Sequence, residues 1–136
     1  MHSKFYISAM NTSLSIAEAA KATGLSPYTL RYYEQIGLIA PVERRGGARR
    51  YGDADMRWLE FLVRLRATGM SMRDMQRYAQ LRRQGNTPAS LAERQTLMED
   101  HAQRVEADMR VLGETLDYIR NKIRIYETMR AQKKRT

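Results

Sequence analysis

The chain of 136 residues contains no cysteine and only two histidines. Without cysteine there are no disulfide bonds, no thiolate metal ligands and no thiol-based redox sensing. His2 and His101 are far apart in the sequence, and only scattered acids such as Glu99 and Asp100 stand near the second of them. We therefore expect no metal site, and we interpret His101 as a polar residue of a helix seam or of the surface.

Long apolar segments are missing as well. No run of hydrophobic residues approaches the roughly 20 residues that a helix needs to span a bilayer. The N-terminal stretch lacks the apolar centre of a secretory signal peptide. We therefore expect a soluble, cytoplasmic protein with no membrane partner.

The sequence also lacks the patterns that are typical of enzymes. It has no Cys or His nucleophile pair, no glycine-rich loop that could hold a phosphate, and no carboxylates clustered at catalytic spacing. The one paired glycine, Gly46-Gly47, is interpreted as a turn. We expect neither catalysis nor a bound cofactor.

Positive charge, in contrast, is abundant. Lys and Arg number 24 against 15 Asp and Glu, which gives a formal net charge of +9. Such a charge attracts polyanions over long range. Nucleic acid is the first candidate partner and an anionic membrane the second. The length suits one compact domain with an extension.

Two short helices are predicted at the start of this domain. Ser15 with Glu18 forms a capping-box signature for a helix at about residues 16–22, and Gly24 follows as a stop signal. Ser26 as N-cap and Pro27 at the first helical position indicate a second helix, which Gly37 ends. Two short helices around one glycine are typical of a helix-turn-helix.

A hairpin and two further helices complete the domain. The chain around Gly46-Gly47 reads as a hairpin, or wing, which carries four arginines. Asp53 is expected to cap a third helix, and Ser71 a fourth helix that ends near Gly85. On the fourth helix we interpret the hydrophobic side chains as core packing rather than a ligand site; they are Met72, Met75 and Tyr78.

The last predicted helix opens at Thr87-Pro88 and repeats its hydrophobic residues in heptads. A helix of about 40 residues would reach roughly 60 Å, which exceeds the width of a small domain. Its apolar seam therefore needs a second chain, as in a coiled-coil homodimer. The seam residues are Leu91, Met98, Val105, Met109, Leu112, Leu116, Ile119, Ile123 and Tyr126.

These elements divide the chain into four expected parts. Residues 1–13 form a flexible leader, and residues 14–85 a winged helix-turn-helix domain. Residues 87–130 form the dimerisation helix, and residues 131–136 a basic tail. The fold class is therefore mainly α.

The second helix is predicted to have two different faces. With 100° between successive residues, Leu30 and Tyr33 share one side with Glu34, which suits a core. The other side carries side chains that could bind phosphate or base edges in a groove of DNA. Its residues are Tyr28, Arg31, Tyr32 and Gln35.

Several of these stretches closely resemble MerR-type transcriptional regulators. The likeness is strongest in residues 14–39, where Leu30-Arg31-Tyr32-Tyr33-Glu34 is followed by Gly37-Leu38. Residues 49–53 are similar to the wing motif of that family, and residues 66–71 to the turn between its third and fourth helices. The likeness covers residues 14–84 in detail, and the long helix matches in kind.

The resemblance implies how the protein works. A homodimer binds a near-palindromic promoter operator, bends and untwists the DNA, and so realigns promoter elements for RNA polymerase. It also implies an antiparallel pair of long helices. The implied DNA contacts are Arg31, Tyr32 and Tyr33 on the recognition helix, Arg49 and Tyr51 in the wing, and Arg66 beside a second wing. We add Tyr28 from the outward face of the helix and Arg50 of the wing, although the family often has an aromatic residue at the position of Arg50.

Two family devices for sensing are missing here. Metal and redox sensors of the family place cysteines around the dimerisation helix, and this chain has none. Larger members add a C-terminal ligand domain, whereas only residues 130–136 follow the seam. Any effector is expected to use the dimer helices or to be absent. The alternative function is a coiled-coil module whose basic surface binds an acidic protein or an anionic membrane.

Overall fold

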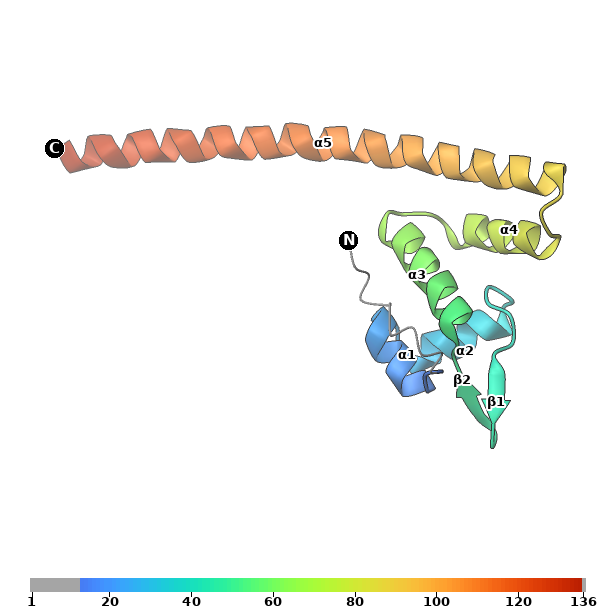
Figure 1. The fold of residues 1–136 in the computed structure, drawn as a ribbon. Coiled ribbons are helices and arrows are strands. Elements are labelled where there is room, and N and C mark those ends of the chain that lie inside the picture. The colour runs from blue at the N-terminus through green and yellow to red at the C-terminus, as the bar shows by residue number, and fades with distance from the viewer. Residues whose placement is uncertain (1–12, 136) are drawn as a thin grey trace. The chain divides into compact units, whose positions relative to one another are not determined.

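A computed structural model describes residues 13–135, and within this range it contains five helices and one hairpin (Figure 1). The mainly α class with a helix-turn-helix, a wing and a long last helix is confirmed. Most of the predicted leader, residues 1–12, lies outside the described range. The elements are α1 (Ile16–Thr23), α2 (Pro27–Gln35), β1 (Glu43–Arg45), β2 (Ala48–Arg50), α3 (Asp53–Ala67), α4 (Met72–Arg83) and α5 (Pro88–Arg135).

The predicted caps of the helix-turn-helix are present. Ser15 Oγ accepts a hydrogen bond from Glu18 N at 3.1 Å, and Glu18 Oε1 accepts one from Ser15 N at 2.9 Å. The hydrogen bond from the Ser15 backbone holds the pKa of the Glu18 carboxyl below its ordinary value. At the start of α2, Ser26 Oγ accepts from Thr29 N at 3.0 Å. Both helices therefore begin where short polar side chains satisfy free backbone donors.

The wing turns at the paired glycines, as predicted. Gly46 and Gly47 have φ angles of 57° and 83°, and two successive positive φ angles suit the turn that matches the twist of a two-residue hairpin. The strands are antiparallel and pair Glu43 with Arg50. Beyond them, Leu14 and Tyr51 exchange two backbone hydrogen bonds of 2.8 Å. The chain before α1 is thus tied to the end of the wing.

The third helix begins differently from the prediction. Asp53 is its first residue rather than its cap, and Gly52 occupies the N-cap position. Asp55 Oδ2 accepts a hydrogen bond from Gly52 N at 2.9 Å, so a carboxylate of the first turn satisfies the backbone at this end. The predicted cap of α4 is present, because Ser71 Oγ accepts from Asp74 N at 3.1 Å.

The core lies between α1, α2, α3 and α4. Its largest side chains that are less than 2% exposed come from α2, the following loop, α3, α4 and the end of the wing. Of the predicted core residues on α4, Met75 is buried, while Met72 and Tyr78 are half-buried. The large core side chains that are less than 2% exposed are Leu30, Leu38, Tyr51, Leu59, Leu62, Met75 and Leu81.

The long helix begins at Pro88, as predicted, but continues beyond its predicted end. It has 48 residues and continues to Arg135, so the described part of the expected basic tail is helical. The contacts of the chain divide it into two compact units, with the border inside α5 between Leu97 and Met98. The first turns of α5 belong to the first unit, because Ser90 Oγ donates to Leu81 O at 2.6 Å.

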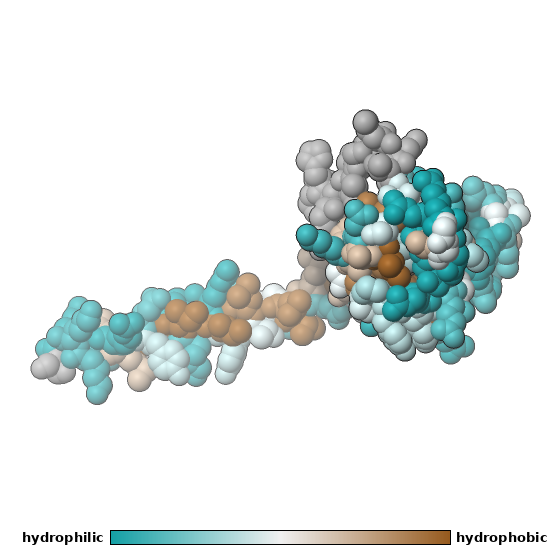
Figure 2. Space-filling view, turned by 90° about the horizontal axis from the view of Figure 1, so that it is seen from below, coloured by the Kyte–Doolittle hydropathy of each residue, from teal (hydrophilic) through white to brown (hydrophobic). Residues whose placement is uncertain are grey.

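Hydrophobic side chains gather in a band along α5 (Figure 2). Most members of the predicted seam are between 45% and 69% exposed in the single chain. His101 is 6% exposed, so a surface position for this residue is wrong. Among the described residues, no helix is both long enough and apolar enough to cross a membrane.

Substitutions on the two faces of α2 should have very different effects on stability. Leu30 is fully buried, so Leu30→Ala should lower the free energy of unfolding by about 2 to 5 kcal/mol through lost packing and a cavity. Tyr28 on the same helix is 73% exposed, and Tyr28→Ala should change it by no more than about 0.5 kcal/mol. Urea denaturation of both variants measures the difference; equal losses would contradict the orientation of α2.

Candidate nucleic-acid interface

The second helix exposes the face that the sequence predicts. Tyr28 and Tyr32 are 73% and 44% exposed, and Arg31 and Gln35 are exposed beside them. The helix is held on its other side by Leu30 and by its neighbours in the core. Two aromatic rings and a guanidinium are thus presented to solvent on one short helix.

This face and the wing line the same groove. The groove has a volume of about 450 Å³ and combines side chains of α2 with Pro41 and with Arg49 of strand β2. A basic residue of the wing therefore lies with the exposed face of α2. The lining residues are Tyr28, Arg31, Tyr32, Glu34, Gln35, Pro41 and Arg49.

An ion-pair cluster fastens the wing to α2. Glu34 Oε1 lies 3.0 Å from Arg49 Nε, and Glu34 Oε2 lies 3.6 Å from Arg44 Nη2. The Glu34 and Arg49 side chains are only 12% and 21% exposed, so water screens their attraction less than that of a surface pair. The sequence interpretation assigned Glu34 to the core side of α2 and missed this role.

Arg31 is placed differently from Arg49. Its side chain is exposed, and it forms no ion pair with any acidic residue in the range 13–135. Its positive charge is therefore available to a ligand on the exposed face of α2, whereas part of the Arg49 charge is used inside the protein.

Two tyrosines that were expected to contact DNA are buried. Tyr33 is 2% exposed, and its hydroxyl oxygen accepts a hydrogen bond from Arg66 Nη1 at 2.6 Å. Tyr51 is fully buried, and burial raises the pKa of its phenol. The interpretation of these side chains as direct contacts is corrected. Tyr33 supports Arg66, and Tyr51 fills the core.

The remaining predicted arginines lie outside the groove lining. Arg50 donates from Nε to Ser13 Oγ at 3.0 Å and from Nη2 to the Ser13 carbonyl. It therefore fastens the segment before α1 to the wing. Arg66 is exposed at the end of α3, where the hydroxyl of Tyr33 holds one of its nitrogens.

Metal-ligating side chains do not gather in the described range. Within residues 13–135, no group of three or more His, Asp or Glu side chains could hold a metal ion. The groove formed by α2 and the wing is lined by guanidinium and phenol groups together with the carboxylate of Glu34.

Comparisons with known proteins agree with this geometry. The sequence model of one protein family, described as MerR HTH family regulatory protein, matches residues 14–81. An uncharacterised HTH-type transcriptional regulator of Haemophilus influenzae is 36% identical over 116 residues, which cover 85% of this chain and 84% of that protein. The regulator AdhR of Bacillus subtilis is 38% identical over 93 residues, which cover 68% of this chain and 65% of that protein.

Two solved structures are similar over almost the whole chain. A MerR family regulator from Listeria monocytogenes has a TM-score of 0.79 and 36% identity, and the match covers 90% of this chain and 93% of that one. HiNmlR, a MerR family regulator that lacks the sensor domain and was crystallised with promoter DNA, has a TM-score of 0.77 and 35% identity. That match covers 88% of this chain and 94% of HiNmlR. The chain belongs to the MerR HTH family of regulatory proteins and is a DNA-binding transcriptional regulator.

Proposed function

We propose that a homodimer of this chain binds double-stranded promoter DNA, with α2 of each copy in a major groove and the wing on the flanking phosphates. The observation that carries this proposal is the single surface formed by the exposed face of α2 and Arg49 of the wing. Helix-turn-helix proteins place their second helix in the major groove, and dimers use two half-sites about one helical turn apart.

The side chains of this surface suit both tasks of a DNA-binding protein. Arg31 can pair bidentately with a guanine, and Tyr28 and Tyr32 can pack on sugars or thymine methyl groups while their hydroxyls meet phosphates. The wing carries Arg45, which is exposed and pairs only with the exposed Glu43, and Arg49 for phosphate contacts. Promoter DNA in the similar HiNmlR structure supports the same ligand for this chain.

The long helix supports a homodimer. In the single chain, Leu112 is 69% exposed and Leu116 45% exposed, although both belong to the heptad seam. A contiguous hydrophobic band of this kind is seldom left open to water, and a second copy of α5 would cover it. The charges on α5 are unevenly distributed along the helix.

This uneven charge favours an antiparallel pair. All acidic residues of α5 except Glu127 precede Ile119, whereas most of its basic residues follow Ile119. A parallel pair would set each basic end beside its copy, while an antiparallel pair sets it beside the acidic half of the partner. The basic residues that follow Ile119 are Arg120, Lys122, Arg124, Arg130, Lys133, Lys134 and Arg135.

The same dimer accounts for regulation. In keeping with the family resemblance, the bound dimer bends and untwists the promoter and so changes the spacing that RNA polymerase reads. DNA deformation of this kind costs free energy that the extra contacts of the dimer must offset. We place the protein in the cytoplasm, where bacterial relatives such as AdhR would meet their promoters, with RNA polymerase as its second partner.

Selection of bound fragments from random DNA tests the proposed function. Enrichment of an inverted repeat would support it, because two copies of α2 read two symmetric half-sites. Featureless binding that depends only on salt would contradict it, and would favour a basic coiled-coil module.

Replacement of Arg31 tests base recognition. Arg31→Ala should reduce operator affinity by about 1 to 3 kcal/mol per half-site, and Arg31→Lys should restore it only in part, because a lysine lacks the planar fork. Thermal unfolding should hardly change, since the side chain is exposed. Arg110→Ala removes the same charge from α5 and serves as the control. A lowered melting temperature with unchanged affinity would make Arg31 a structural residue.

Replacement of Arg49 separates positioning from specificity. Arg49→Ala should weaken binding to all DNA sequences alike and lower the salt slope by about one unit per half-site. It should also lower thermal stability, because the half-buried Glu34 loses its nearest partner. Arg45→Ala at the exposed tip of the wing should change the salt slope without this loss of stability. The assignment fails if Arg49→Ala removes preference at one base and leaves the salt slope intact.

Replacement of Leu112 tests the dimer seam. Leu112→Asp would bury a carboxylate without a partner between the two helices, at a cost of several kcal/mol, and should dissociate or unfold the dimer. Val111, which is 61% exposed and lies outside the heptad pattern, provides the control Val111→Asp. Sedimentation equilibrium gives the mass of each variant. An unchanged dimer mass for Leu112→Asp would show that the seam is elsewhere.

A further inference from the structure

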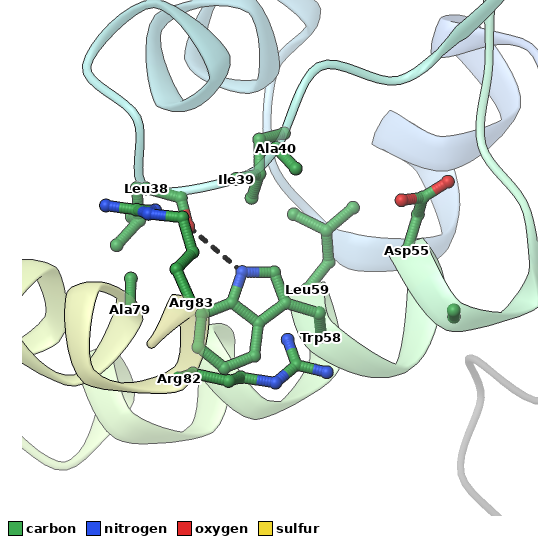
Figure 3. Close-up of a pocket in the computed structure, with 10 residues that line it drawn as sticks. Leu38, Ile39, Ala40, Asp55, Trp58, Leu59, Ala79, Arg82 and Arg83 are labelled. Atoms are coloured by element: carbon green, nitrogen blue, oxygen red, sulfur yellow. Dashed lines mark hydrogen bonds between the residues drawn. The ribbon is translucent and has the colours of Figure 1, made fainter. Parts of the chain in front are cut away.

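A second hollow lies on the first unit, between the loop that follows α2 and the helices α3 and α4 (Figure 3). Its volume is about 280 Å³, near the lower end of the range for ligand pockets. It shares no lining residue with the groove of α2 and the wing. We call it the Trp58 pocket, because the only tryptophan of the sequence stands in its lining.

The walls of the Trp58 pocket are mainly hydrophobic and firmly packed. Leu38 and Leu59 contribute buried side chains, and Trp58 presents its indole. The indole is held by neighbouring rings, since its centroid lies 5.7 Å from that of Phe61 and 6.0 Å from that of Tyr78. A flat or branched apolar group would therefore meet a preformed surface.

Two arginines of α4 give the pocket an excess of positive charge, because Asp55 is the one acidic residue in its lining. The guanidinium carbon of Arg82 lies 4.4 Å from the centroid of the Trp58 ring. Neither Arg82 nor Arg83 has an acidic partner among residues 13–135, unlike Arg77, which pairs with Glu93 at 2.7 Å. In Figure 3, Asp55 lies beyond Leu59 on the side away from Arg83, and its carboxylate accepts from Gly52 N.

The same side chains hold the end of the recognition helix. Trp58 Nε1 donates to the carbonyl of Leu38 at 3.0 Å, and Arg83 Nη1 donates to the carbonyl of Gly37 at 2.7 Å. Gly37 lies just beyond the C-cap of α2, so Arg83 fastens the turn that ends this helix. The pocket lining and the support of α2 are therefore made of the same residues.

From this arrangement we propose that the Trp58 pocket binds a small amphipathic carboxylate and that this binding lowers the affinity of the protein for DNA. The carboxylate pairs with the guanidinium groups of Arg82 and Arg83, and the apolar part packs on Trp58 and Leu59. The proposed effector site thus lies in the DNA-binding domain, whereas the sequence analysis expected any effector to use the dimer helices or to be absent.

The effect on DNA follows from competition for Arg83. A ligand carboxylate accepts from the guanidinium that otherwise donates to Gly37, and the turn that ends α2 loses a charged donor. Because α2 carries Arg31 on its exposed face, a shift of the helix changes the fit of that side chain in the groove. The lowered affinity for DNA rests on the proposed function, whereas the binding of a carboxylate in the Trp58 pocket does not.

Fluorescence of Trp58 provides a direct test, because the protein has no other tryptophan. Phenylbutyrate is the probe, and phenylbutanol, which has the same ring and chain without the negative charge, is its control. Phenylbutyrate should change the emission saturably at millimolar concentration, as Arg82 moves from the ring to the carboxylate. The alcohol should bind at least about tenfold more weakly.

Three variants assign the binding to this pocket. Ala54 lines it but is exposed, so Ala54→Leu should fill the space without disturbing the core and should abolish the saturable change. Arg82→Gln should weaken phenylbutyrate by about tenfold. Arg73→Gln removes an exposed arginine elsewhere on α4 and should leave the affinity unchanged. Circular dichroism spectra checked beforehand show that each variant is folded.

DNA titrations of the intact protein complete the test. Saturating phenylbutyrate should lower operator affinity by about fivefold or more in the original chain and have no effect on the Ala54→Leu variant. If the protein binds its operator but shows no saturable emission change, or responds equally to phenylbutanol, the pocket proposal is wrong and the proposed function stands. If phenylbutyrate binds and no DNA sequence is selected, the proposed function fails while the ligand site remains. If the original chain does not bind phenylbutyrate and Ala54→Leu changes the mass of the dimer, the pocket is a contact between copies and the proposal is wrong.

Discussion

The recognition helix α2 has only nine residues, and an isolated helix shorter than about 12 to 15 residues is barely stable in water. The rest of the domain must therefore hold it in shape. Leu30 anchors its inner side in the core, Glu34 joins it to Arg49 of the wing, and Arg83 of α4 donates to the carbonyl of Gly37 just beyond its end. Each contact leaves the outer face open, so stability and DNA recognition use different sides of the same helix.

Local signals predicted most of the fold. A cap such as Ser15 with Glu18, or the paired glycines of the wing, involves residues within three or four positions of each other, and these pairings form wherever the local backbone allows. The long helix α5 and its apolar seam could likewise be predicted from the heptad repeat, because this repeat places its hydrophobic residues on one side of a helix. The start of α3 was predicted less well, because Asp53 and Asp55 both suit an N-terminal turn.

Contacts across the chain could not be predicted in the same way. Arg83 and Gly37 are 46 positions apart, and Glu34 and Arg49 are 15 positions apart. Such pairs depend on the packing of whole helices, which periodicity does not specify. The resemblance also implied DNA contacts for Tyr33 and Tyr51, whereas the helix periodicity alone had placed Tyr33 on the core side, as the structure does.

The pairing of Leu14 with Tyr51 determines how short a functional piece of this protein can be. Tyr51 is fully buried, and both of its backbone hydrogen-bonding groups are satisfied by Leu14 alone. A fragment that began at Ser15 would leave an amide and a carbonyl without partners in the core, at about 1 to 3 kcal/mol for each group. It would also lose the serine that holds Arg50. The smallest self-standing DNA-binding domain therefore begins no later than Ser13.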